Sequence, residues 1–360
     1  MSPRGAVQFL LEAGALREEE AVSAILEIRN VSRRNSGLIV ANGTGSGFYL
    51  KQGIGEERRR TVGNEATILL DLQAALAHDP STPSFLPELV VFDPVRCALV
   101  TRVVPNSKSL MDLSRRRRIY SETVACALGN ALGHFHRLVA ATGYSGASSA
   151  DFVPFPFRAV EPELSMLVSL SAANVDLVRV VQNSDGYLPL LRKARADWNP
   201  EHLIHGDVRM DNCILSGSRR SGRVTIVDWE LSGRGDPAWD VGTVLAEYIG
   251  AWLLSIPIVR DTTAEQLFSF ARLPFSMVRR AVGAFMTAYE VAYTAYGPAR
   301  GERITKAVRL AGVRLLQIAF EQLQAAHELS GQAVYVLQLS LNILKRPDQA
   351  AGAFFGIDVA

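Results

Sequence analysis

Two aspartates and one asparagine have a spacing that could serve phosphoryl transfer. The segment His205–Asn212 (HGDVRMDN) places Asp207 five residues before Asn212, and Asp228 ends the second of the two apolar runs that follow. A loop of this length can hold Asp207 against an acceptor hydroxyl, while Asn212 and Asp228 converge on a Mg²⁺ ion that bridges nucleotide phosphates. We therefore predict Mg²⁺-dependent chemistry, with Asp207 at the acceptor and Asn212 and Asp228 as metal ligands.

A β-hairpin would bring these residues together. Cys213–Leu215 and Val224–Val227 are short apolar runs on either side of a polar turn, residues 216–223, which is the pattern of two paired strands. From Leu110 onward the rest of the chain is mainly helical in pattern. The clearest examples are Tyr120–Thr142, Glu161–Val181 and long stretches between Phe275 and Ile343. Residues 106–360 are thus predicted to form a helical catalytic and acceptor-binding lobe.

The amino-terminal third has a different pattern, in which short strands surround a single helix. The predicted strands are Ile25–Val31, Leu38–Ala41, Phe48–Gln52, Leu86–Phe92 and Cys97–Val103, and the predicted helix is Glu57–Ala77. The Pro-Asn-Ser sequence at residues 105–107 has the composition of a linker. We therefore expect an α+β fold with two lobes, in which residues 1–105 form a small lobe with an antiparallel sheet.

Length and composition agree with a two-lobed globular protein. The chain has 360 residues, 48% of them hydrophobic and 21% charged, and its net charge of +2 gives no sign of a nucleic-acid or membrane partner. Three widely spaced cysteines indicate neither a disulfide framework nor a zinc site, which favours the cytoplasm. The chain start lacks a signal-peptide pattern, and Val241–Val259 contains Glu247, which predicts a buried helix rather than a membrane span.

Three motifs in order resemble those of the aminoglycoside phosphotransferase and choline kinase superfamily, relatives of the protein kinases. Residues 205–212 resemble its catalytic loop, Ile226–Glu230 its metal-binding segment, and Gly235–Asp240 (GDPAWD) the structural motif that follows. The resemblance covers nearly the whole chain. It implies a bilobal protein-kinase-like fold, with ATP and Mg²⁺ as cofactors and an alcohol group as the phosphate acceptor.

The resemblance also implies a nucleotide site in the smaller lobe. Lys51 matches the lysine that holds the nucleotide's α- and β-phosphates, and Glu65 on the next helix matches its ion-pair partner. The hinge corresponds to residues 99–105, with Val103 and Val104 as backbone contacts to adenine. The residue types alone leave another interpretation open, in which Lys51 only protects an edge strand from pairing.

The turn between the first two predicted strands, residues 32–37, is expected to face the nucleotide phosphates. Arg33, Arg34 and Asn35 are candidates there to donate hydrogen bonds to phosphate, although solvated turn residues would have the same composition.

Around the catalytic loop, the resemblance assigns architectural roles to His205, Asp236 and Asp240, which are expected to brace the loop through hydrogen bonds. Arg209 departs from the family, which often has histidine at this position, and resembles the cation found there in many protein kinases. Its guanidinium could stabilise the charge on the γ-phosphate, and it could equally pair with Asp211 or Glu230.

The acceptor is less clearly indicated than the chemistry. From Val244 to the end, the chain has nine acidic residues and eleven Lys or Arg. A site for a polycationic aminoglycoside would be expected to show a surplus of carboxylates, so this balance weakens that reading. The arginine run at residues 115–118 is a candidate docking surface for an acidic partner, with a solvated helix start as the alternative.

Three stretches also resemble stand-alone kinases of class V lanthipeptide and thioamitide biosynthesis. They are Arg29–Asn35, Tyr49–Gln52 and Leu337–Pro347. This resemblance implies that the acceptor is a Ser or Thr of a ribosomally made precursor peptide and that a separate lyase then eliminates the phosphate. The alternatives are a small-molecule hydroxyl acceptor, as in an aminoglycoside, amino alcohol or sugar kinase, and a non-catalytic kinase-like scaffold.

Overall fold

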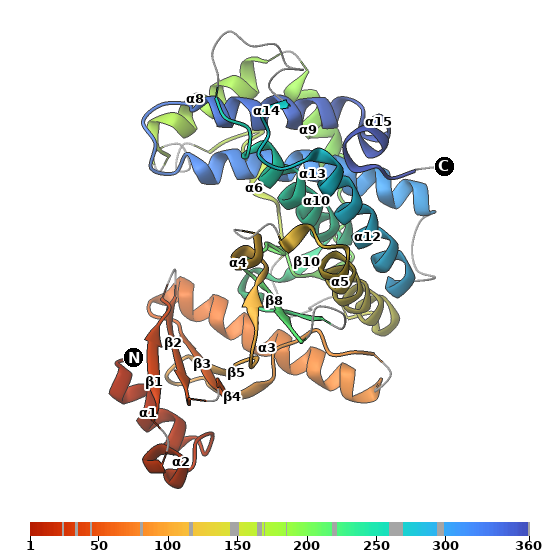
Figure 1. Ribbon diagram of the computed structural model, residues 1–360. Helices are drawn as coiled ribbons and strands as arrows, with labels where there is room; N and C mark the ends of the chain where they lie inside the picture. The colour runs from red at the N-terminus through yellow and green to blue at the C-terminus, as the bar shows by residue number, and fades with distance from the viewer. Residues whose placement is uncertain are drawn as a thin grey trace.

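The computed structural model has two lobes, a smaller one built around a sheet and a larger helical one (Figure 1). It describes residues 1–23, 25–32, 35–43, 45–79, 82–114, 118–144, 151–163, 168, 170–184, 186–217, 222–258, 269–293 and 299–358. Of the residues predicted to act, Arg33 and Arg34 lie outside this set, as do residues 115–117 of the arginine run. The predicted α+β fold with two lobes is confirmed.

The smaller lobe contains a five-stranded antiparallel sheet with the strand order β1-β2-β3-β5-β4. Its strands are β1 (Glu27–Asn30), β2 (Ser36–Ala41), β3 (Gly47–Gln52), β4 (Leu89–Asp93) and β5 (Ala98–Arg102). Side chains alternate across each strand, so Leu50 and Val100 face one side of the sheet while Lys51 and Leu99 face the other. The second side is covered by helix α3 (Glu56–His78), which carries Glu65.

An amino-terminal helix that the sequence analysis did not identify covers the first side of the sheet. Helix α1 (Pro3–Glu12) begins after Ser2, whose hydroxyl accepts a hydrogen bond from the Gly5 N–H, and a short α2 (Glu18–Ser23) follows. Phe9 and Leu10 of α1 pack against the sheet in a core of their own. The apolar run near the chain start therefore completes the smaller lobe.

The larger lobe is mainly helical, as predicted. Its helices are α4 (Leu110–Ser114), α5 (Glu122–Thr142), α6 (Phe155–Arg158), α8 (Ala172–Asn183), α9 (Tyr187–Ala196), α10 (Pro237–Leu253), α12 (Phe275–Tyr293), α13 (Arg300–Gln322), α14 (Gly331–Lys345) and α15 (Pro347–Ala350), with short turns η1 (Arg118–Tyr120), η2 (Trp229–Leu231) and η3 (Ala351–Phe355). Helix α5 packs along α12, and α13 lies between α10 and α14. No helix among the described residues is long and apolar enough to cross a membrane.

One predicted helix, Glu161–Val181, is wrong in its first part. Residues 161–163 are not helical, and Pro162 in this segment lacks the N–H that a helix interior needs. Helix α8 begins only at Ala172, where the hydroxyl of Ser171 accepts a hydrogen bond from the Asn174 N–H.

Two small sheets frame the catalytic loop. The predicted hairpin is present as β8 (Cys213–Ser216) and β9 (Arg223–Ile226), and β6 (Lys108–Ser109) adds a third strand. Strand β7 (His202–Ile204) pairs with β10 (Gly233–Gly235), which the sequence analysis missed because both strands are only three residues long. The loop between β7 and β8 is thereby held at both ends.

A glycine allows α5 and α12 to approach closely. A Cβ added at Gly129 would lie 2.3 Å from the Phe285 carbonyl oxygen, so Gly129→Ala should lower the free energy of unfolding by about 1–3 kcal/mol, the usual cost of overpacking. Urea denaturation measures this change. Gly63→Ala in α3 is the matched control, because a Cβ there meets nothing within 4 Å and alanine should be neutral or stabilising by up to about 1 kcal/mol. Equal effects of the two substitutions would contradict the close approach.

Candidate active site

The catalytic loop is tied to the start of α10 by hydrogen bonds to its backbone. Asp240, which is fully buried, accepts hydrogen bonds from the N–H groups of His205 (2.8 Å) and Gly206 (2.9 Å). The indole Nε1 of Trp239 donates to the Gly206 carbonyl at 2.9 Å. Asp240 therefore lies where the sequence analysis expected it, with its carboxylate against the backbone that leads into Asp207.

His205 connects the catalytic loop to the strand that precedes Asp228. Its Nδ1 accepts a hydrogen bond from the Asp207 N–H (3.2 Å), so its Nε2 carries the proton and donates to the Val227 carbonyl at 3.1 Å. The ring is completely buried, and burial lowers the pKa of His205. A neutral imidazole thus links the two segments that carry the predicted base and the predicted metal ligand.

Asp236 does not contact the catalytic loop, contrary to expectation. Its carboxylate caps α10 by accepting a hydrogen bond from the Ala238 N–H (3.0 Å), accepts another from the Asn199 N–H (3.1 Å) and forms an ion pair with Lys306. The reason is its place at the N-cap, where a side chain folds back over the first helical turn. The residue beside Asp240 is instead His136, whose Nε2 lies 3.2 Å from Asp240 Oδ2.

Lys51 lies among three carboxylates at the junction of the two lobes. Its Nζ is 2.7 Å from Glu65 Oε2 and 2.7 Å from Glu230 Oε2, and it also contacts Asp228 Oδ1. Burial alone would lower the pKa of Lys51, but these carboxylates raise it well above its ordinary value. Lys51 is 3% exposed and lies on β3, the central strand, so it does not protect a sheet edge.

The same carboxylates are chemically suited to a divalent cation. Oxygen atoms of Glu65, Asp228 and Glu230 lie within 4.8 Å of one another, and hard cations such as Mg²⁺ prefer oxygen ligands. Asp228 has a left-handed backbone conformation (φ +68°) and a side chain that is 40% exposed, whereas Glu230 is nearly buried. Glu230 was not among the predicted metal ligands, although it belongs to the segment that resembles the family's metal-binding motif.

Asn212, the other predicted metal ligand, lies beside Asp207. Its Nδ2 donates to the Asp207 carbonyl oxygen (2.9 Å) and to Asp207 Oδ2 (3.0 Å). The backbone carbonyl of Asn212 accepts a hydrogen bond from the Val227 N–H at 2.9 Å. Asn212 therefore lies next to the residue that precedes Asp228. The structure therefore brings Asp207, Asn212 and Asp228 together at the two ends of the hairpin.

Some of the predicted nucleotide contacts outside Lys51 are already engaged within the part of the chain that the structure describes. Asn35 is buried, and its Nδ2 donates to Glu230 rather than pointing out of the turn. In the predicted hinge, the Val103 N–H donates to the Gly47 carbonyl (2.9 Å) and the Val104 carbonyl accepts a hydrogen bond from Ser107 Oγ (2.6 Å). Asn35 Nδ2 and the Val103 N–H would have to exchange partners before they could donate to a nucleotide.

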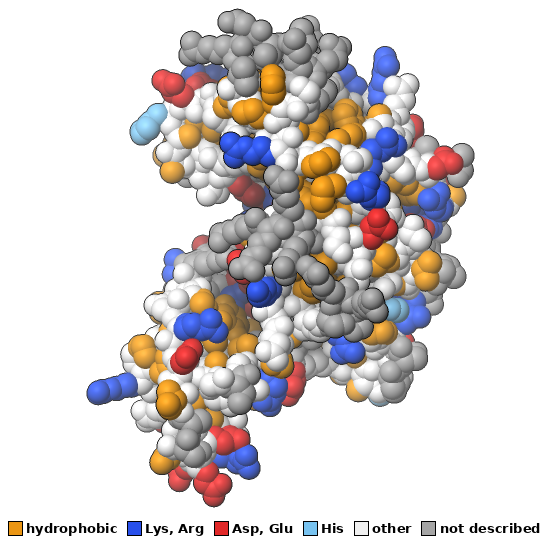
Figure 2. Space-filling view, in the orientation of Figure 1, with side chains coloured by type: hydrophobic (Ala, Val, Ile, Leu, Met, Phe, Trp, Pro, Cys, Tyr) orange, Lys and Arg blue, Asp and Glu red, His pale blue; other side chains and the backbone are white. Residues whose placement is uncertain are grey.

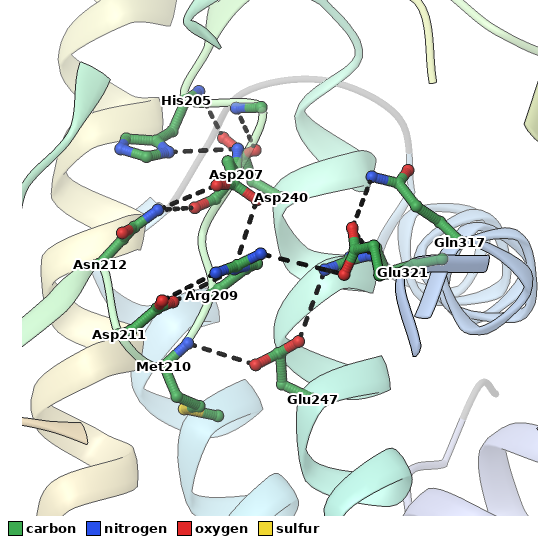
Figure 3. A network of polar contacts seen from close by, with 12 residues as sticks. His205, Asp207, Arg209, Met210, Asp211, Asn212, Asp240, Glu247, Gln317 and Glu321 are labelled. Atoms are coloured by element: carbon green, nitrogen blue, oxygen red, sulfur yellow. Dashed lines mark hydrogen bonds and ion pairs between the residues drawn. The ribbon is translucent and has the colours of Figure 1, made fainter. Parts of the chain in front are cut away.

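Arg209 lies between the catalytic loop and the helices of the larger lobe (Figure 3). Its Nε and Nη2 donate to Asp211 at 3.1 and 2.7 Å, which is one of the pairings left open by the sequence. Its Nε is also 3.8 Å from Asp207 Oδ1, and its Nη1 is 3.9 Å from Glu321 Oε2. Arg209 is thus adjacent to the predicted base and connected to helix α13.

Burial raises the pKa of Asp207 to about 6, although the guanidinium groups of Arg209 and Arg314 oppose the shift. A general base accepts a proton only as the carboxylate, so kcat/KM for the acceptor should rise about tenfold per pH unit up to about pH 6 and level off above it. Initial rates at acceptor concentrations well below KM across a buffer series measure this profile. The residual activity of Asp207→Asn should lack the rise, and a flat wild-type profile between about pH 5 and 7 would contradict the assignment.

Comparison with known proteins agrees with these motifs. The sequence pattern of the phosphotransferase enzyme family matches residues 110–298, more than half of the 360 residues. Among curated proteins, 4-hydroxytryptamine kinase of Psilocybe cyanescens is 26% identical over 172 residues, which are 45% of this chain and 46% of that protein. The chain therefore spans about half the length of this relative.

Solved structures share the fold over nearly the whole chain. A choline/ethanolamine kinase family protein from Mesorhizobium loti has a TM-score of 0.51 at 19% identity, covering 94% of this chain and 93% of its own. A microcompartment-associated aminopropanol kinase (TM-score 0.52, 14% identity, 95% and 98% covered) and the amicoumacin kinase hAmiN (0.52, 13%, 94% and 93%) are similar to the same extent. On the match over residues 110–298, the chain belongs to the phosphotransferase enzyme family.

Proposed function

We propose that this protein transfers the γ-phosphoryl group of ATP to the hydroxyl of a Ser or Thr in a ribosomally made precursor peptide. The observation that carries the transfer is the meeting of Asp207, Asp228 and Lys51 at one junction between the lobes. The Asp228 side chain at this junction is 40% exposed, and the molecular surface is indented between the two lobes (Figure 2).

In this proposal, the acceptor oxygen forms a bond to the γ-phosphorus, the bond to the bridging oxygen breaks, and ADP leaves. Asp207 orients the hydroxyl and takes its proton, and Arg209 beside it stabilises charge on the transferred group. Asp228, with Asn212 or Glu230, would hold Mg²⁺, which supplies charge neutralisation at the phosphates when bound. Lys51 would exchange its contact with Asp228 for the α- and β-phosphates.

Two observations support a nucleotide and a metal. The cluster formed by the carboxylates of Glu65, Asp228 and Glu230 offers the oxygen ligands that a divalent cation needs. The similar amicoumacin kinase was crystallised with AMP-PNP and Ca²⁺.

The peptide acceptor is supported by the stretches that resemble lanthipeptide and thioamitide kinases and by the balanced charge of the carboxy-terminal part. A separate lyase would then eliminate the phosphate to leave a dehydroamino acid. A small-molecule hydroxyl is the second candidate, because the similar proteins are kinases of 4-hydroxytryptamine, aminopropanol and amicoumacin. A non-catalytic scaffold is disfavoured, since Lys51, Asp207 and Asp228 are all present and lie together.

A competition between acceptors tests the proposal. The purified protein is incubated with Mg-ATP and candidate precursor peptides encoded near its gene, in parallel with choline, an amino alcohol and an amino sugar. Mass spectrometry should show an addition of about 80 Da to the peptide, one phosphoryl group on Ser or Thr. The same incubation with Asp207→Asn is the control. Phosphorylation of a small molecule without any phosphopeptide would replace the first candidate by the second.

A further inference from the structure

An arginine is buried inside the larger lobe directly behind the catalytic loop. Arg314 of α13 is 1% exposed, and its neighbours Val313 and Leu315 are fully buried apolar residues. Its Nη1 donates to Glu321 Oε1 (2.9 Å) and its Nη2 to Glu321 Oε2 (3.2 Å). The Nη2 atom also lies 3.7 Å from Glu247 Oε1 of α10. Arg314 is therefore paired with a carboxylate from each of two packed helices.

Each of these two carboxylates reaches the catalytic loop. Glu247 Oε2 accepts a hydrogen bond from the Met210 N–H at 3.3 Å, and Glu321 Oε2 lies 3.9 Å from Arg209 Nη1. Figure 3 shows Glu247 and Glu321 on the helix side of the loop, directed toward Met210 and Arg209. The two contacts fall between Asp207 and Asn212, so they restrain the part of the loop that carries both.

The helix geometry makes this arrangement specific. Arg314 and Glu321 are seven residues apart, which is two helical turns, so both side chains lie on one face of α13. Gln317, one turn after Arg314 on that face, donates to Glu321 Oε1 at 3.0 Å. Two donors from the same helix, Arg314 and Gln317, thus fix the Glu321 carboxylate that lies beside Arg209.

Stability alone does not account for a charged group at this position. Buried ion pairs are commonly no more stabilising than well-packed apolar residues of the same volume, because both charges lose their hydration. A leucine or methionine at position 314 would suit the surrounding apolar core. The contacts to the catalytic loop give the buried charge a use that an apolar residue would lack.

We propose that Arg314 is a positioning residue for phosphoryl transfer, which acts through Glu247 and Glu321 to fix the loop segment that carries Asp207 and Arg209. The proposal rests on the proposed roles of those two residues. A displacement of about 1 Å in a reacting group can cost about a hundredfold in rate. Loss of the restraint should therefore lower turnover without weakening nucleotide binding, because Lys51 and its partners lie outside this network.

The test combines hydrogen–deuterium exchange with kinetics on Arg314→Met, Arg314→Lys and the matched control Arg309→Met. Arg309 lies on the same helix and pairs with Asp197, a residue outside the catalytic loop. In Arg314→Met, amide exchange in residues 207–212 should become about tenfold faster or more, while residues 47–52 of the sheet stay unchanged. With the acceptor found above, kcat should fall about ten- to a hundredfold and the KM for ATP should change less than about threefold.

The two remaining variants separate positioning from general destabilisation. Arg314→Lys, which keeps the positive charge, should show a smaller increase in loop exchange and a smaller loss of kcat than Arg314→Met. Arg309→Met should show neither change. Unchanged loop exchange in a folded Arg314→Met, or equal effects from Arg309→Met, would overturn the proposal. If Arg314→Met does not fold, Glu321→Gln provides the same test, because it removes the carboxylate charge through which Arg314 acts on Arg209. Faster loop exchange then supports the proposal, and unchanged exchange overturns it.

Exchange is measured without any acceptor, so it is independent of the proposed function. A protein that phosphorylates no peptide can still show the loop effect, and a protein that does phosphorylate the peptide can fail to show it.

Discussion

Asp207→Asn should lower kcat by about two to four orders of magnitude, the range expected for loss of a general base, while Mg-ATP still binds. Asparagine keeps an oxygen for the hydrogen bond from Asn212 Nδ2, which is 3.0 Å from Asp207 Oδ2, so the loop should keep its conformation. Single-turnover transfer measures the rate, and fluorescence titration with a nucleotide analogue measures binding.

Asp151→Asn is the matched control for this substitution. Asp151 is an exposed carboxylate that pairs with Arg234 at 2.8 Å, and an exposed pair of this kind contributes little, about 0–1 kcal/mol. Its removal should leave transfer within about twofold of the original rate. Near-normal turnover of Asp207→Asn, with the control also normal, would show that another group accepts the proton.

Asp228→Ala should abolish measurable transfer and weaken Mg-ATP binding, because the phosphate charge would lose the cation that neutralises it. We expect a loss of about three orders of magnitude or more in kcat/KM. The fold should survive, since the Asp228 side chain is 40% exposed and Lys51 keeps Glu65 and Glu230 as partners.

Metal titrations of three variants distinguish the candidate ligand sets. In either set, Asp228→Ala should raise the Mg²⁺ concentration needed for half-saturation, which is measured by binding of a nucleotide analogue because this variant should not transfer phosphate. Asn212→Ala should have the same effect if Asn212 and Asp228 hold the ion. Glu230→Gln should have it if the ion is held by the three carboxylates around Lys51. An unchanged Mg²⁺ dependence of Asp228→Ala would assign the ion to a different carboxylate.

Residue patterns predicted those parts of the fold that repeat over several residues. The strands around Lys51 are short, mainly apolar runs between turn residues, and α3 and α13 have helical periodicity. Strands β7 and β10 have only three residues each, too few for a period to emerge. Helix α1 was missed because its apolar run was examined as a targeting signal and not as a helix.

In the active site, local motifs identified the residues that share a loop or strand end, such as Asp207 and Asp228. They did not identify Glu247 and Glu321, which contact the catalytic loop from 37 residues (Met210–Glu247) and 112 residues (Arg209–Glu321) further along the chain. Nor did they identify Arg314, which pairs with both glutamates. Contacts between elements so far apart depend on how the helices cross, which a single sequence does not encode locally. Asp236 was misassigned for a related reason, since its motif could not reveal which way its side chain turns.

The three carboxylates around Lys51 also bear on how this protein would respond to lysine-directed reagents. An amine attacks an electrophile only after it loses its proton, and the pKa of Lys51 is raised well above the ordinary value by its neighbours. Activated esters should therefore acylate the other lysines, Lys108, Lys193, Lys306 and Lys345, well before Lys51. A covalent inhibitor aimed at Lys51 would need a group that first draws Glu65 and Glu230 away from its ammonium.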